Sequence, residues 1–67
     1  MIKVIVNVFS SGILISRIEM VETEFRLHYH PLIRGQEWDE DNEIHAYGPG
    51  FDFIFKKVED NHESDSM

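Results

Sequence analysis

The sequence predicts a mainly β domain, with α+β as the alternative, in which four to five strands form a small antiparallel sheet. Three observations favour this fold class. β-Branched and aromatic residues gather in short runs, polar residues alternate with apolar ones inside several of them, and turns rich in Gly, Pro or Ser separate them. Because 67 residues make one domain, we place a β-rich domain at residues 1–58. We expect the acidic tail, residues 59–67, to be disordered, since it has no apolar residue before the last Met.

The first run, residues 2–9, predicts a strand because its β-branched residues share one face: Ile2, Val4, Val6 and Val8. Residues 10–12, Ser-Ser-Gly, have the composition of a turn. Residues 13–20 leave two alternatives open. We favour a second strand that forms a hairpin with the first. A short helix within residues 11–20 is the other, because apolar residues also recur there at helical spacing: Leu14, Ile18, Val21 and Phe25.

Residues 21–30 alternate between apolar or Thr residues and charged or His residues, which predicts a half-buried strand. Pro31 should end this strand, since proline has no N–H to donate. A polar loop, residues 35–42, follows. Two further β-prone runs, residues 43–47 and 51–58, flank Gly-Pro-Gly and predict a second hairpin. The expected core is Val4, Val6, Val8, Ile15, Val21, Phe25, Leu27, Tyr29, Ile44, Phe51, Phe53 and Phe55.

Charge is the strongest compositional signal. The net charge is −7, from 13 acidic and 6 basic residues. Residues 1–35 carry three acids and four bases, whereas residues 36–67 carry ten acids and two bases, so the whole excess lies in the second half. A basic face is what phosphate-backbone binding requires, and we therefore expect no direct binding of nucleic acid.

Other function classes find little support. No apolar run approaches the roughly 20 residues that span a bilayer, so we expect no membrane partner. The chain has no Cys, which removes disulfides and thiolate sites and suits a reducing cytoplasm. We interpret it as cytosolic, untargeted and full length. No hydroxyl nucleophile stands in a strand-turn-helix context, and no paired carboxylates stand in an apolar stretch. We expect no enzyme activity, no catalytic residue and no cofactor.

Two patterns suggest a metal only weakly. On a strand, His28 and His30 would project from one face about 6.6 Å apart, with Glu37 or His45 as a further ligand. Two histidines on a solvated face explain the same pattern. The run of residues 39–43, Asp-Glu-Asp-Asn-Glu, resembles part of a calcium loop but lacks the Gly that such a loop needs. We predict no metal site.

An acidic binding surface is the functional prediction. Trp38 lies inside the densest acidic run, and an aromatic within a charged rim is a common anchor for a protein partner. A surface that only solubilises the chain is the competing interpretation. The candidate partner-binding residues are Glu37, Trp38, Asp39, Glu40, Asp41, Glu43, Asp52, Glu59 and Asp60.

Carboxylates along an extended segment advance about 3.3 Å per residue, close to the phosphate spacing of duplex DNA, about 3.4 Å per strand. In size, acidity, lack of Cys and its clustered acids, the chain resembles the small acidic proteins with which bacteriophages take over their hosts. Within that class it is most similar to DNA mimics, including inhibitors of the bacterial nucleoid protein HU. The resemblance implies an inhibitor that acts in the host cytoplasm, where its acids occupy a basic DNA-binding protein.

A second hypothesis remains open, namely an adaptor or accessory domain that binds a protein by strand addition or through Trp38, with the acids incidental. We also expect a homodimer, because the core is small and the first strand is apolar on both faces, with Ile5 and Phe9 opposite the valines.

Overall fold

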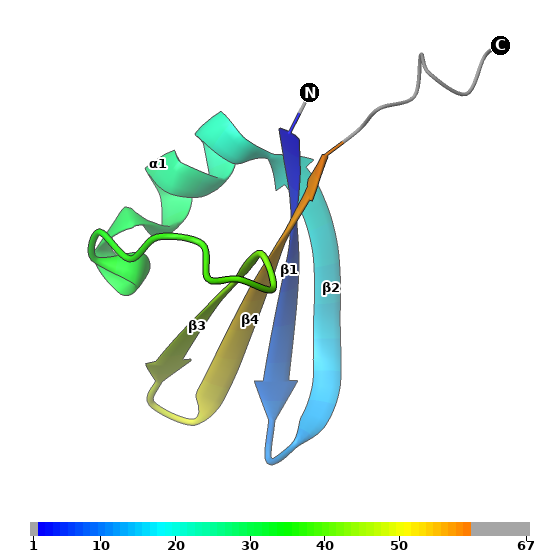
Figure 1. Ribbon diagram of the computed structural model, residues 1–67. Coiled ribbons are helices and arrows are strands. Elements are labelled where there is room, and N and C mark those ends of the chain that lie inside the picture. Colours follow the sequence, from blue (N-terminus) through cyan, green and yellow to red (C-terminus); the bar gives the residue numbers. More distant parts are fainter. Residues whose placement is uncertain (1, 60–67) are drawn as a thin grey trace, which may run out of the picture.

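A computed structural model describes residues 2–59 of the chain (Figure 1). Its elements are β1 (Ile2–Ser10), β2 (Ile13–Val21), α1 (Glu22–Ile33), β3 (Glu43–Gly48) and β4 (Phe51–Glu59). The four strands form one antiparallel sheet in the order β2-β1-β4-β3. The predicted fold class, a mainly β domain with a four-stranded antiparallel sheet and one short helix, is therefore confirmed.

The first hairpin joins β1 to β2 through the predicted turn. Ser11 and Gly12 both have positive φ there, 54° and 78°, which suits Gly and lets the chain reverse tightly. The strand alternative for residues 13–20 is confirmed, and no helix forms within residues 11–20. The register shifts between Val8, which faces Ser16, and Phe9, which faces Leu14. This bulge leaves Ile15 without a direct partner in β1.

The second hairpin is also confirmed. It joins β3 to β4 through Pro49 and Gly50, and Gly48 pairs with Phe51. The aromatic residues Phe53 and Phe55 of β4 face Ala46 and Ile44 of β3. β4 ends at Glu59, one residue beyond the expected domain boundary, and the rest of the predicted tail lies outside the described residues.

The predicted strand over residues 21–30 is wrong, because residues 22–30 lie in α1 and Val21 is the last residue of β2. Although their polarity alternates, the two groups that the fold buries most completely in α1 are Phe25 and Ile33, eight positions apart on one helical face. Two side-chain contacts at i, i+4 spacing support the helix: an ion pair of Glu22 with Arg26 at 3.6 Å and a hydrogen bond of Glu24 with His28 at 3.3 Å. Both glutamates also lie in the first turn, where their negative charge interacts favourably with the positive end of the helix dipole.

Pro31 does not end a strand, since it lies in the last turn of α1. The helix instead ends at Ile33 and is capped by Arg34, whose φ of 49° is left-handed and whose N–H donates to the carbonyl of His30 at 3.0 Å. Gly35, with φ 81°, continues the reversal into the loop.

The core lies between α1 and one face of the sheet. Its buried side chains are Val4, Val6, Phe25, Ile33, Ile44, Ala46 and Phe55. Phe25 stands at its centre, with ring centroids 4.8 Å from Phe55 and 5.7 Å from Tyr29. Tyr29 in turn lies 5.2 Å from Phe55, so the helix covers β4 through aromatic contacts.

The expected core is partly wrong. Leu27 is 74% exposed because the helix turns it away from the sheet, Ile15 is 53% exposed at the bulge, and Phe51 is exposed at the start of β4. Ile33 and Ala46 are buried but were not expected. Val8, Tyr29 and Phe53 pack around the core as half-buried residues, and Val21 is half-buried at the end of β2.

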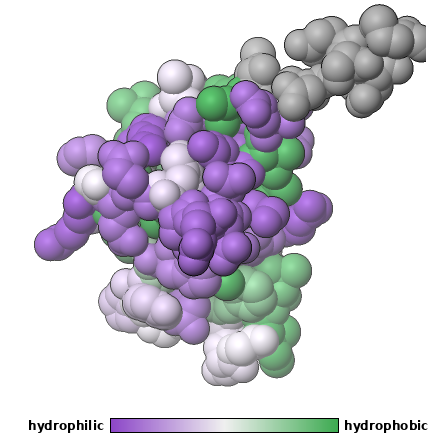
Figure 2. Space-filling view, viewed as in Figure 1, coloured by the Kyte–Doolittle hydropathy of each residue, from purple (hydrophilic) through white to green (hydrophobic). Residues whose placement is uncertain are grey.

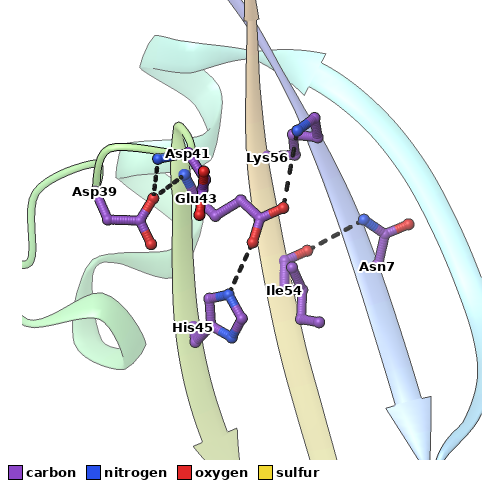
Figure 3. A network of polar contacts seen from close by, with 7 residues as sticks. All are labelled: Asn7, Asp39, Asp41, Glu43, His45, Ile54 and Lys56. Atoms are coloured by element: carbon purple, nitrogen blue, oxygen red, sulfur yellow. Dashed lines mark hydrogen bonds and ion pairs between the residues drawn. The ribbon is translucent and has the colours of Figure 1, made fainter.

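The other face of the sheet has no helix over it within residues 2–59. There the side chain of Asn7 in β1 donates to the carbonyl of Ile54 in β4 at 3.3 Å (Figure 3). α1, with 12 residues, is the one helix within residues 2–59, and it is not long and apolar enough to cross a membrane.

Candidate functional site

The acidic loop, residues 37–43, connects α1 to β3 and contains five of the predicted site carboxylates. It crosses in front of the sheet in Figure 1, and Figure 2 shows hydrophilic side chains gathered over the middle of the same view. Most of the predicted acidic surface is thus confined to one short segment beside β3.

Asp39 fixes the shape of this loop. Its Oδ1 accepts hydrogen bonds from the backbone N–H of Asp41 at 2.8 Å and of Glu43 at 2.9 Å (Figure 3). Its backbone N–H donates to the carbonyl of Glu43 at 3.0 Å, and its carbonyl accepts from Asn42 at 2.9 Å. The loop is therefore a closed turn held by its own aspartate.

The same bonds set the ionisation of Asp39. The backbone N–H of Glu43 is the main cause that holds the pKa of this carboxyl below its ordinary value, and partial desolvation works against it. The N–H of Asp41 and the nearby His45 and Lys56 lower the pKa further. Asp39 thus stays a carboxylate well into the acidic range.

Asn42 fastens the loop to the sheet. It adopts a left-handed conformation, with φ 61°, which Asn tolerates better than most residues. Its carbonyl accepts a hydrogen bond of 2.8 Å from the backbone N–H of Lys57 in β4. The loop therefore has one end anchored on the central part of the fold.

Two loop carboxylates are partly neutralised by the fold itself. Glu37 lies 3.6 Å from the guanidinium of Arg26 on α1. Glu43 lies 3.8 Å from the ammonium of Lys56 and 2.9 Å from the imidazole of His45 (Figure 3). These contacts reduce the charge that Glu37 and Glu43 present to a partner.

Glu40 and Asp41 differ from the other acids of the loop. Both are exposed, and their carboxylates make no hydrogen bond or ion pair within residues 2–59. They stand directly after Asp39, in the turn that it holds closed. The loop therefore presents two free carboxylates on a backbone that Asp39 holds in place.

Trp38 is not an exposed anchor. Its ring centroid lies 5.5 Å from that of Phe25, and its Nε1 donates to Oε2 of Glu22 at 3.0 Å. Arg26 and Lys57 lie over the ring at 5.7 and 5.9 Å. The indole thus closes the edge of the core beneath the loop, which explains an aromatic residue inside an acidic run.

The remaining predicted site residues do not join the loop. Asp52 pairs with Tyr47 at the turn end of the β3–β4 hairpin, whereas Glu59 pairs with Ile2 at the opposite end of β4. Asp60 lies outside the described residues. The described acids therefore do not form one continuous arc.

The histidines that were considered as metal ligands are also separated from one another. On a helix, His28 and His30 are two positions apart and point to different sides, so the spacing argued for a strand does not apply. His28 contacts Glu24, and His45 contacts Glu43. Within residues 2–59 no group of three or more His, Asp or Glu side chains is arranged to hold a metal ion.

A surface hollow runs along α1. Its lining residues all belong to the helix: Glu22, Thr23, Arg26, Leu27, His30 and Pro31. A hollow lined by a single helix has no opposing wall from another element, so nothing in it brings reacting groups together from two sides.

The sequence did not predict that Asp39 holds the turn closed or that Trp38 packs against the core. Asp39 followed by Asn42 is a signal for a side-chain-capped turn and could have been found. The contacts of Trp38 with α1 could not, because they depend on residues 22–26 being helical. Comparison with models of known families, with curated proteins and with solved structures found no match.

Proposed function

We propose that this chain is a binding protein without catalytic function, which docks its acidic loop onto a basic surface of a nucleic-acid-binding protein. The loop carboxylates take the place of nucleic-acid phosphates, and the bound target loses access to DNA. The observation that carries the proposal is that Glu40 and Asp41 are exposed and unpaired, in a turn whose backbone Asp39 holds closed.

A rigid loop suits this role because its order is established before binding. Association otherwise costs free energy for every loop and side chain that becomes ordered. The hydrogen bonds of Asp39 and the bond from Lys57 to Asn42 supply that order in the free protein. The net charge of −7 adds a long-range attraction toward a basic target, which speeds encounter at low salt.

The competing adaptor hypothesis has less support at Trp38, because this residue is half-buried, packs against Phe25 and has its N–H bonded to Glu22. An indole in this position is not available to enter a pocket on a partner unless the core opens. Strand addition, the other anchor, concerns the two edge strands, β2 and β3.

The experiment uses purified bacterial HU as a defined basic probe, with duplex DNA as competitor. Glu40→Lys and Asp41→Lys each change the loop charge by two, and Asp52→Lys makes the same change at the far end of the sheet. We expect the loop variants to weaken binding to HU roughly tenfold or more and Asp52→Lys to weaken it by much less. Equal losses in all three variants, or no binding of the native chain to HU, would contradict the proposal in this form.

A further inference from the structure

β2 is an edge strand whose outer side is unprotected. It pairs with β1 on one side, and no other strand of residues 2–59 pairs with it on the other. Its nine residues contain no Pro, and α1 leaves it to pack over β4. In Figure 1 β2 forms the right-hand margin of the sheet, and no other helix or strand of residues 2–59 lies on its outer side. A long edge of this kind offers free backbone N–H and C=O groups to another strand.

The side chains of β2 are unusually apolar for a free edge. Ile13 is 66% exposed, Ile18 is 46% exposed, and Leu14 and Ile15 are exposed as well. These four are half of the large exposed hydrophobic residues in the described part of the chain. Figure 2 shows hydrophobic side chains along the margin where β2 runs. A concentration of exposed apolar side chains of this kind is typical of an interaction surface.

The two charges of β2 identify the occupant. Arg17 and Glu19 lie on the face opposite α1, facing Asn7 and Ile5 of β1. Neither makes an ion pair or side-chain hydrogen bond within residues 2–59. They are two residues apart, with Ile18 between them, so β2 is charge-complementary to an antiparallel copy of itself.

We propose that two copies of this chain pair through β2, antiparallel, about a two-fold axis at Ile18. This register pairs residues 15–21 of the two copies, whereas Ile13 and Leu14 lie beyond the paired residues. It places Arg17 opposite Glu19 of the second copy, twice by symmetry, and Ile18 opposite its own counterpart. Centring the axis on residue 17 or 19 instead places like charges opposite each other. Centring it on residue 16 leaves both charges opposite apolar residues.

The pairing continues the sheet across both copies, in the order β3-β4-β1-β2-β2-β1-β4-β3. It differs from the interface expected from the sequence, because β1 is the strand between β2 and β4 and has no free edge. The acidic loop precedes β3, at the other edge of each sheet, so both loops remain open in the dimer. The inference therefore stands independently of the proposed function.

The absence of Cys allows a direct test. Ile18→Cys puts two thiols opposite each other at the axis, and we expect a disulfide-linked dimer under mild oxidation. Leu27→Cys, an exposed apolar position on α1, is the matched control and should cross-link much more slowly. A native chain that sediments as a monomer at high micromolar concentration, or equal cross-linking of the two variants, overturns the proposal.

A charge swap tests the register without relying on a cysteine. Arg17→Glu and Glu19→Arg should each raise the dissociation constant of the dimer roughly tenfold or more, because each puts like charges opposite each other twice. The double variant Arg17→Glu/Glu19→Arg should restore it. Single variants that leave the dimer unchanged, or a double variant without rescue, overturn the axis at Ile18. A monomer that instead adds an extended peptide at β2 would identify another occupant and overturn the pairing of two copies.

Discussion

The Nε1 of Trp38 donates a hydrogen bond of 3.0 Å to Oε2 of Glu22, and this contact joins the acidic loop to the first turn of α1. The same carboxylate oxygen lies 3.6 Å from Arg26, which also stands over the indole and reaches Glu37. Loop and helix therefore share a network built around one half-buried ring. The site and the core are coupled at Trp38.

This coupling predicts that Trp38 contributes more to stability than to binding. Trp38→Ala removes the contact with Phe25 and the hydrogen bond from the indole to Glu22, so we expect a loss of about 2–4 kcal/mol in the free energy of unfolding. Trp38→Phe, which keeps a ring but not the N–H, should lose about 1 kcal/mol. Urea unfolding followed by far-UV circular dichroism measures both, and Tyr47→Ala at a 73% exposed position is the control. A Trp38→Ala variant as stable as that control would show that the indole does not support the core.

Because residues 22–33 are helical, alanine substitution should lower the stability strongly at Phe25 and hardly at all at Leu27. Phe25 is fully buried, and Phe25→Ala should cost about 3–5 kcal/mol, a large part of the roughly 3–10 kcal/mol expected for a chain of this length. Leu27→Ala removes a side chain that faces solvent and should change stability by less than about 0.5 kcal/mol. On an alternating strand both residues would be buried. Similar losses in the two variants, measured by thermal unfolding, would therefore contradict α1.

Much of the sheet could be predicted from local pattern. The β-branched face of residues 2–9 and the Gly-containing turns after Ser10 and Gly48 are strong short-range signals, and the strands follow them. α1 was missed because its polarity happens to alternate, so period two hid the spacing of Phe25, Tyr29 and Ile33. The i, i+4 pairs from Glu22 and Glu24 were the available helical signal.

The site was predicted less completely than the fold, for a related reason. The number of acids in the sequence locates the loop. It does not distinguish carboxylates that make hydrogen bonds or ion pairs within the fold from those that remain unpaired. Asp39 holds backbone N–H groups, and Glu43 contacts Lys56 on the neighbouring strand. Only strand register decides that Lys56 lies beside Glu43 while Asp52 lies at the other end of β4.

The ionisation of Asp39 predicts a change in the loop at low pH. Because the folded pKa lies below the ordinary value of 3.8, the carboxylate stabilises the loop fully above that value. That contribution is lost as the pH falls through the folded pKa, since the protonated group accepts the two N–H bonds less well. Hydrogen exchange at the amides of Asp41 and Glu43 should therefore speed up in that range, after correction for intrinsic rates. Asp39→Ala should show fast exchange at every pH, and an unchanged exchange rate in that variant would contradict the role of Asp39.

The proposed binding mode predicts a steep response to salt. Exposed ion pairs are each worth about 0–1 kcal/mol, so affinity for a basic target such as HU must come from several of them acting together. Their field reaches about 8–10 Å at physiological ionic strength and only about 3 Å at 1 M salt. We therefore expect affinity for HU to fall steeply between about 50 and 500 mM salt, mainly through slower association. Glu40→Lys and Asp41→Lys should flatten this dependence, whereas Asp52→Lys should preserve most of it.

Duplex DNA should displace the chain from HU in the same titration. Binding that is equal at both salt concentrations, or a complex that holds DNA and this chain together, would show that the loop does not occupy the phosphate-binding surface.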